Sequence, residues 1–155
     1  MEICKKIWKM VGKHKHITGI MDMNYNVLKV LDEDVRVPPC PYDMNSQQKI
    51  LFHTHPLSSS RDCASDFPSS NDILITLTKG YRQHLVITRK GVYVLIPVNP
   101  RLTIRQASLL NMLFEIEKNT EDAWCPKYHD PSQLCETMNK ILEGFMTCSF
   151  YPFNI

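Results

Sequence analysis

Apolar side chains recur every three or four positions in three stretches of the chain, and capping signals mark a fourth, so four helices are predicted. The first covers 2–12 and ends at Gly12, and the second begins in the turn 69–72 and ends at Gly80. The third begins at Thr103 and the fourth at Asp130. The apolar positions that define the helical faces are Ile3, Ile7, Met10 and Val11, then Leu109, Leu113 and Ile116, then Leu134, Met138, Ile141 and Phe145.

Short apolar runs bounded by turn residues predict five strands, at 16–23, 27–31, 49–53, 84–88 and 92–98. The element order is then α-β-β-β-α-β-β-α-α, which is typical of an α+β domain with one mainly antiparallel central sheet flanked by helices. We expect a single domain over 1–155, with its C-terminal helices over 103–145.

The composition of 155 residues, with 43% hydrophobic and 22% charged residues, is that of a globular domain. The longest apolar runs are far shorter than a membrane span, and the first fifteen residues lack the apolar core of a secretory signal. An intracellular protein, cytoplasmic or nuclear, without a membrane partner is therefore predicted. The basic segment 5–16 is interpreted as a solvated helix face, with nucleic-acid binding the weaker alternative.

Six scattered cysteines show neither a CxxC motif nor a spacing that selects one pairing. Buried, reduced thiols are the expectation for a cytosolic or nuclear protein. The aromatic tail 150–153 is expected to pack on the domain or to dock on a partner.

The strongest candidate for chemistry is the pair His53 and His55, which end the strand that Pro56 interrupts. Residues i and i+2 of a strand project from the same face, so both imidazoles can reach one metal ion. Asp72, in the first turn of the next helix, adds a carboxylate. Two histidines, one carboxylate and an open fourth position are typical of a catalytic zinc site, where the metal lowers the pKa of bound water.

The string FHTHP followed by PSSNDI resembles the signature of the JAMM/MPN metalloprotease family, whose pattern is HxHP, a spacer and SxxD. The likeness covers residues 1–100 and implies the MPN fold, which is cytidine-deaminase-like. It also implies that His53, His55 and Asp72 are zinc ligands and that Ser69 hydrogen-bonds the oxyanion of the tetrahedral intermediate. The loop 57–68 is longer than the usual spacer, so it is interpreted either as a substrate-gripping flap or as an obstruction.

The family's general base is a glutamate in an E-x-x-G string, and here that string is His16-Ile17-Thr18-Gly19. His16 stands at the glutamate position. Three alternatives follow: His16 accepts the proton of the water itself, it binds the metal as a fourth ligand and closes the site, or the site binds zinc without catalysis.

The resemblance implies a zinc-dependent metalloprotease or isopeptidase, similar to deubiquitinases, that acts on a protein substrate such as a ubiquitin-like conjugate. The alternative is a catalytically inactive MPN-like scaffold within a larger protein assembly. The replaced glutamate and the apolar tail motivate this second hypothesis.

Overall fold

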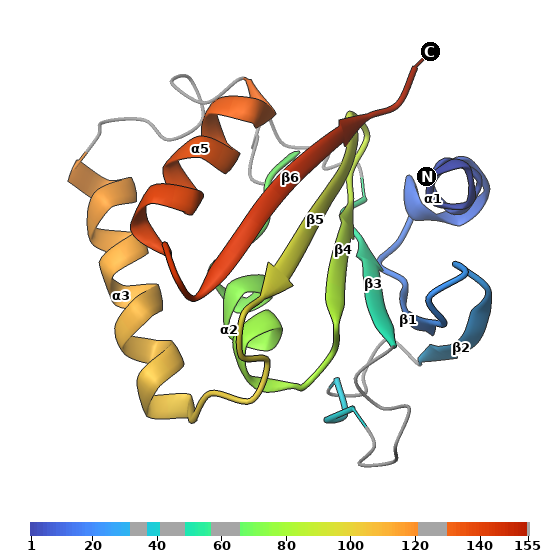
Figure 1. Ribbon diagram of the computed structural model, residues 1–155. Coiled ribbons are helices and arrows are strands. Elements are labelled where there is room, and N and C mark those ends of the chain that lie inside the picture. Colours follow the sequence, from blue (N-terminus) through green and yellow to red (C-terminus); the bar gives the residue numbers. More distant parts are fainter. Residues whose placement is uncertain (32–36, 41–48, 57–65, 121–129, 155) are drawn as a thin grey trace.

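A computed structural model describes residues 1–31, 37–40, 49–56, 66–120 and 130–154. These residues form one α+β unit in which helices flank a six-stranded mixed sheet (Figure 1). In chain order the elements are α1 (Glu2–Ile7), the π-helical turn η1 (Trp8–Gly12), β1 (Thr18–Met21), β2 (Val27–Leu31), β3 (Ile50–Thr54), α2 (Ser70–Thr78), β4 (Gln83–Ile87), β5 (Gly91–Pro97), α3 (Ile104–Thr120), α5 (Pro131–Ile141) and β6 (Met146–Pro152).

The strand order in the sheet is β2-β1-β3-β4-β5-β6. All neighbouring strands are antiparallel except β3 and β4, which α2 connects as parallel neighbours. The sheet is therefore mainly antiparallel, as the sequence predicts. Since β3 and β4 run in the same direction, their carboxyl ends lie at the same edge of the sheet, next to each other.

Helices cover both faces of the central strands, which explains the nearly continuous apolar runs of β4 and β5. On one face, α2, α3 and α5 pack with Val86, Tyr93 and Leu95. On the other face, α1 and η1 pack through Cys4 and Trp8 against sheet residues that include Phe52, Leu85 and Ile87. Figure 1 shows α1 on the side of the sheet opposite α3 and α5.

The main departure from the predicted elements is at the C-terminus. The last helix ends at Ile141 and does not reach Phe145, because Gly144 turns the chain with a φ of 81°. The tail that was expected to pack or to dock on a partner is the edge strand β6, paired antiparallel with β5. Buried Met146 and Cys148 alternate with exposed Thr147 and Ser149, which is the pattern of a half-buried strand.

Two predicted helical faces are also corrected. In the first helix Ile3 and Ile7 pack partly against the core, as predicted, but the buried residues are Cys4 and Trp8, and Met10 is 77% exposed. In α3, Leu109 and Leu113 are exposed. Ala107 is buried against the core instead, and half-buried Leu110 packs beside it, while the side chain of the predicted Ile116 lies outside the described residues.

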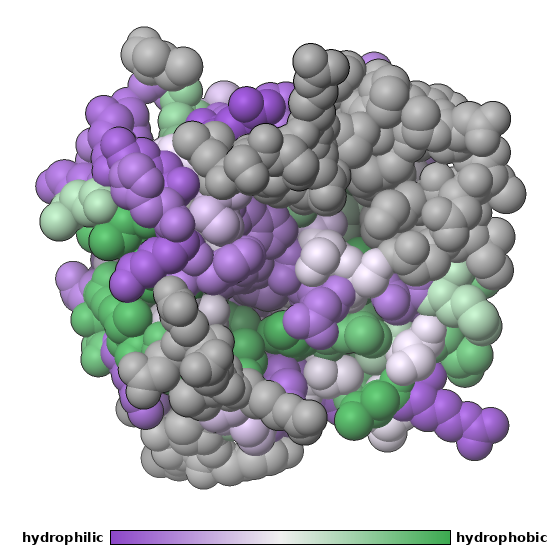
Figure 2. Space-filling view, turned by 180° about the vertical axis from the view of Figure 1, so that it is seen from behind, coloured by the Kyte–Doolittle hydropathy of each residue, from purple (hydrophilic) through white to green (hydrophobic). Residues whose placement is uncertain are grey.

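The surface seen from behind is mixed, with hydrophilic side chains gathered at the upper left and smaller hydrophobic areas elsewhere (Figure 2). Over the whole described surface, the exposed hydrophobic side chains belong largely to β2 and α3, among them Val27, Leu28, Val30 and Met112. Lys9, Lys13 and Lys15 of the basic segment 5–16 are exposed, which agrees with the interpretation of this segment as a solvated surface, although Lys13 and Lys15 follow the helical residues.

Gly19, the glycine of the string that begins at His16, is required by close packing. A Cβ at this position would lie 2.4 Å from Cζ of Phe52 and 2.7 Å from the carbonyl oxygen of Lys29. Gly19 pairs with Phe52 across β1 and β3 and with Val30 across β1 and β2. It thereby lets β1 bring the segment before it, including His16, against the end of β3.

Candidate metal centre

His53, His55 and Asp72 form a compact group of potential metal ligands at the carboxyl end of β3. His53 belongs to β3 and His55 follows it two residues later, so both imidazoles project toward the face that α2 covers. Their Nε2 atoms are 2.8 Å apart. Asp72, in the first turn of α2, places Oδ1 3.1 Å from Nε2 of His53 and Oδ2 3.2 Å from Nε2 of His55.

These separations fit one small divalent cation. Zinc bonds of about 2.0–2.1 Å with tetrahedral angles put neighbouring ligand atoms roughly 3.3 Å apart. Each Nε2 atom lies at nearly this distance from one oxygen of Asp72, at 3.1 Å from Oδ1 for His53 and 3.2 Å from Oδ2 for His55, and the two Nε2 atoms are closer, at 2.8 Å. The side chains are only 13%, 10% and 5% exposed for His53, His55 and Asp72 respectively. A carboxylate and two imidazoles that are this close and this buried require a shared proton or a cation for charge balance.

Asp72 is oriented by the start of its own helix. The backbone N–H of Ser69 donates to Oδ2 of Asp72 at 2.6 Å, and the backbone N–H of Asp72 donates to Oγ of Ser69 at 3.2 Å. This reciprocal pair is a capping box, which satisfies two backbone donors that the helix leaves free. Oδ2 is thus occupied by a backbone donor, and Oδ1 is the oxygen directed at His53.

His53 is oriented by two buried residues, Thr76 of α2 and His84 of β4. Oγ1 of Thr76 donates to the backbone carbonyl of Asp72 at 2.7 Å and lies 2.8 Å from Nδ1 of His84. Nε2 of His84 lies 2.9 Å from Nδ1 of His53. We call these contacts the Thr76–His84–His53 chain.

The direction of each hydrogen bond in this chain follows from the first one. A carbonyl oxygen only accepts, so the single hydroxyl proton of Thr76 goes to Asp72 and Thr76 accepts from Nδ1–H of His84. A neutral His84 then has a lone pair on Nε2 and accepts from Nδ1–H of His53. Neutral His53 is left with its lone pair on Nε2, the atom that faces Asp72 and His55, which is the tautomer a metal ligand needs.

Two pKa shifts describe the same group with a proton, in place of a cation, between Nε2 of His53 and Asp72. Complete burial, followed by the nearby charge of His53, lowers the pKa of His84 to about 3, so His84 is neutral. Burial acts to raise the pKa of Asp72, but the charge and the hydrogen bond of His53 and the hydrogen bond of His55 outweigh it. The pKa of Asp72 is therefore held well below its usual range, and the carboxylate is ionised.

His16 lies beside this group without belonging to it. Its exposed ring meets the ring of His55 edge-on, with 6.2 Å between the ring centroids. Nδ1 of His16 contacts the backbone carbonyl of Thr54 at 2.9 Å, so this nitrogen carries a proton and Nε2 of a neutral ring has a free lone pair. Among the described residues, the ligand group comprises His53, His55 and Asp72 and leaves out His16.

The structure brings every predicted site residue to one place. His16 and Ser69 are exposed at the rim of the group, and His53, His55 and Asp72 form it. The sequence interpretation gives no role to His84, the first residue of the strand predicted at 84–88, and in the structure this histidine is buried against His53. A histidine at the start of an otherwise apolar strand was its available signal. Most of the predicted loop 57–68 lies outside the described residues, although Asp66 at its end accepts two hydrogen bonds from Arg89.

In comparisons with known proteins, no protein-family model, curated protein or solved structure matches the chain. In the described parts of the chain, no helix combines the length and apolar character needed to cross a membrane.

Proposed function

We propose that this protein is a zinc-dependent metalloprotease or isopeptidase of the JAMM/MPN type. The observation that carries the proposal is the buried group of His53, His55 and Asp72, in which the two Nε2 atoms lie 2.8 Å apart and each lies within 3.2 Å of a carboxylate oxygen of Asp72. The sequence order HxHP and SxxD and the α+β architecture with a mixed sheet support the same assignment. Zinc is favoured because it accepts a mixed imidazole and carboxylate ligand set with an open position.

In this proposal His53, His55 and Asp72 hold the metal, which when bound supplies Lewis-acid polarisation of a carbonyl and a water of lowered pKa. The side chain of Ser69 accepts from the N–H of Asp72, so its own hydroxyl proton is available to donate to the oxygen of a substrate carbonyl. His16 is the provisional general base, since Nε2 of its neutral ring has a lone pair at the exposed rim. The buried walls formed by α2 and β4 exclude water from the inner side.

The proposed substrate is an isopeptide or peptide bond of a protein, with ubiquitin-like conjugates as the first class to examine. This choice follows from the family resemblance. The open side of the group, where Ser69 and His16 are exposed, gives such a chain a route of approach.

Metal content and cleavage test the proposal together. We expect about one zinc ion per chain by mass spectrometry for the wild type, and cleavage of isopeptide-linked ubiquitin dimers that stops with a chelator. H53A should lose both properties, and H16A should keep zinc and lose cleavage. The proposal fails if H53A leaves zinc content and cleavage unchanged.

A second candidate is an MPN-like scaffold subunit that binds metal without turnover. The specific observation in its favour is the imidazole of His16 at the position where the family has a carboxylate. Stable zinc, no cleavage of any conjugate by the wild type or by H16E, and a stoichiometric protein partner recovered by co-purification would favour it over the enzyme.

A further inference from the structure

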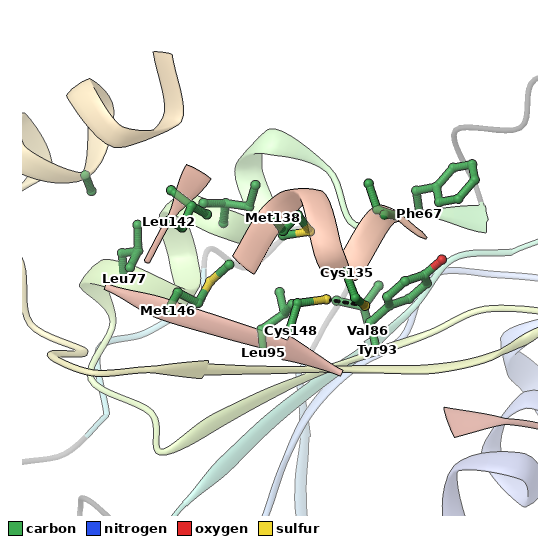
Figure 3. Packing of buried hydrophobic residues seen from close by; sticks show 13 residues of the cluster. Phe67, Leu77, Val86, Tyr93, Leu95, Cys135, Met138, Leu142, Met146 and Cys148 are labelled. Carbon is green, nitrogen blue, oxygen red and sulfur yellow. Dashed lines mark hydrogen bonds between the residues drawn. The ribbon is translucent and has the colours of Figure 1, made fainter. Parts of the chain in front are cut away.

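Cys135 of α5 and Cys148 of β6 face each other inside the core, with their Sγ atoms 2.7 Å apart. Figure 3 shows the two sulfur atoms directed at one another between α5 and the sheet, close to Leu95 and Tyr93. Both side chains are buried, and neither cysteine is in a disulfide in this structure. A covalent S–S bond is about 2.05 Å long, so little movement separates the pair from a bonded geometry.

The backbone around the pair is held in register by a separate contact. The side chain of Asn139, one turn after Cys135 in α5, donates from Nδ2 to the carbonyl of Cys148 at 3.0 Å. Its Oδ1 accepts from the N–H of Cys148 at 2.7 Å. These two bonds fix the position of Cys148 along α5, and pairing of Cys148 with Leu95 of β5 fixes it in the sheet.

We propose that Cys135 and Cys148 are an oxidation site, at which a low-molecular-weight disulfide such as oxidised glutathione converts the two thiols into a cross-link between α5 and β6. In the first step one thiolate attacks glutathione disulfide, which forms a mixed disulfide and releases one reduced glutathione. In the second step the other thiolate attacks the protein sulfur of the mixed disulfide and releases the second glutathione. Two protein thiols are oxidised, one glutathione disulfide is reduced to two thiols, and protons balance.

The same packing makes the reaction slow in the closed fold. The hydrogen bond with Cys135 and burial both raise the pKa of Cys148, so the reactive thiolate is scarce. Glutathione also has no path to a buried sulfur. Exchange therefore requires opening at α5 or β6, and β6 is the last strand of the sheet with a neighbour on one side only.

The cross-link would join two elements whose thiols lie 13 positions apart, and it would close the turn at Gly144. Restricting the unfolded chain in this way stabilises the folded state. Because the native sulfur positions need little adjustment, we expect the oxidised protein to melt several degrees above the reduced protein. The inference does not depend on the proposed function.

The full chain, freed of metal with a chelator, is equilibrated in buffers with varied ratios of reduced to oxidised glutathione. One sample starts folded and a second is refolded from urea in the same buffer, so slow access cannot hide the product. We expect the protein mass to fall by two hydrogen atoms, a tryptic species that joins Cys135 to Cys148, and a Tm that returns to the reduced value with dithiothreitol.

C4S is the matched control, since Cys4 is buried on the opposite face of the sheet and should leave the cross-link intact. C135A and C148A should each abolish the cross-link and the redox-dependent part of the Tm, even where either variant lowers the reduced Tm. The inference is overturned if neither sample yields the Cys135–Cys148 species. It is equally overturned if both cysteines end as mixed disulfides with glutathione.

Discussion

At the scale of single residues, the orientation of His53 is settled by an uncharged chain of hydrogen bonds and not by an acidic partner. Thr76 donates to a carbonyl, which obliges His84 to donate to Thr76 and to accept from His53. Histidine ligands commonly donate their second N–H to a carboxylate or a carbonyl. Here the neutral, buried imidazole of His84 accepts the N–H of His53, and it places no further charge beside Asp72.

We expect H84F to weaken binding of zinc or cobalt by about 10- to 100-fold, since outer-shell partners of ligands have effects of this size. Phenylalanine fills the space but cannot accept from Nδ1–H of His53. H84Q is the matched control, because its amide oxygen can accept that bond and should recover part of the affinity. Competition with a chromophoric chelator measures both variants, and equal affinities for H84F and the wild type would contradict the role.

His84 also links stability to pH. Its pKa is lowered from 6.5 to about 3 in the folded chain. Between these pH values His84 therefore binds a proton in the unfolded chain but not in the folded chain. The free energy of unfolding should therefore decrease as the pH falls from 6.5 toward 3, by at most about 1.4 kcal/mol per pH unit from this residue.

Urea unfolding of metal-free protein at several pH values between 7 and 4 measures this effect. Other groups also contribute to acid sensitivity, so the informative quantity is the difference in slope between the wild type and H84Q. A slope unchanged by H84Q would contradict the assignment of a neutral, buried imidazole.

At the scale of elements, Ser69 at the N-terminus of α2 both caps the helix and contacts the proposed metal ligand Asp72. Ser69 caps the helix through its side chain, and its backbone N–H holds Oδ2 of Asp72. A loss of activity in a Ser69 variant would therefore be ambiguous if the helix were also weakened.

Comparison of S69G with S69A separates the capping role of the Ser69 side chain from its proposed role in catalysis. Glycine at an N-cap costs only a few tenths of a kcal/mol, whereas alanine costs about 1 kcal/mol. Both variants keep the backbone N–H, so we expect both to bind metal. If the hydroxyl assists catalysis, S69G should lose cleavage while its stability in urea stays close to that of the wild type. Full activity of S69G would restrict Ser69 to a capping role.

At the scale of the whole molecule, the ligand group joins segments from both sides of the loop 57–68. His53 and His55 come from the end of β3, and Asp72 comes from the helix that crosses to β4. A cation that bridges them should therefore stabilise the folded chain as a whole, because the unfolded chain has no assembled site.

Zinc at about 100 times its Kd should increase the free energy of unfolding by about 2.7 kcal/mol, which raises Tm by roughly 5–10 °C in a domain of this size. Scanning calorimetry with and without zinc measures the shift. H53A removes a ligand and should show almost no shift. A zinc-dependent shift that persists in H53A would place the metal elsewhere.

Much of this organisation is readable from local sequence. The turn 69–72 and Gly80 bound α2 because a capping box and a glycine with a φ of 85° act within a few residues. Thr103 and Gln106 mark the start of α3 by the same local chemistry. The last helix is predicted to reach Phe145 because its apolar positions keep a helical spacing to that residue, whereas Gly144 turns the chain before it. The strand β6 that follows depends on tertiary pairing with β5, which local spacing does not reveal.

Contacts between residues close in sequence follow from local geometry alone. His53 and His55 share a face because the side chains of a strand alternate, and Ser69 contacts Asp72 because the start of a helix brings residues three apart together. Only the tertiary structure placed His84 beside His53, His16 beside His55 and Cys135 against Cys148. The reason is strand register between distant segments. Leu51 pairs with His84 across β3 and β4, and a slip of one residue would turn His84 toward α1 and away from the metal ligands.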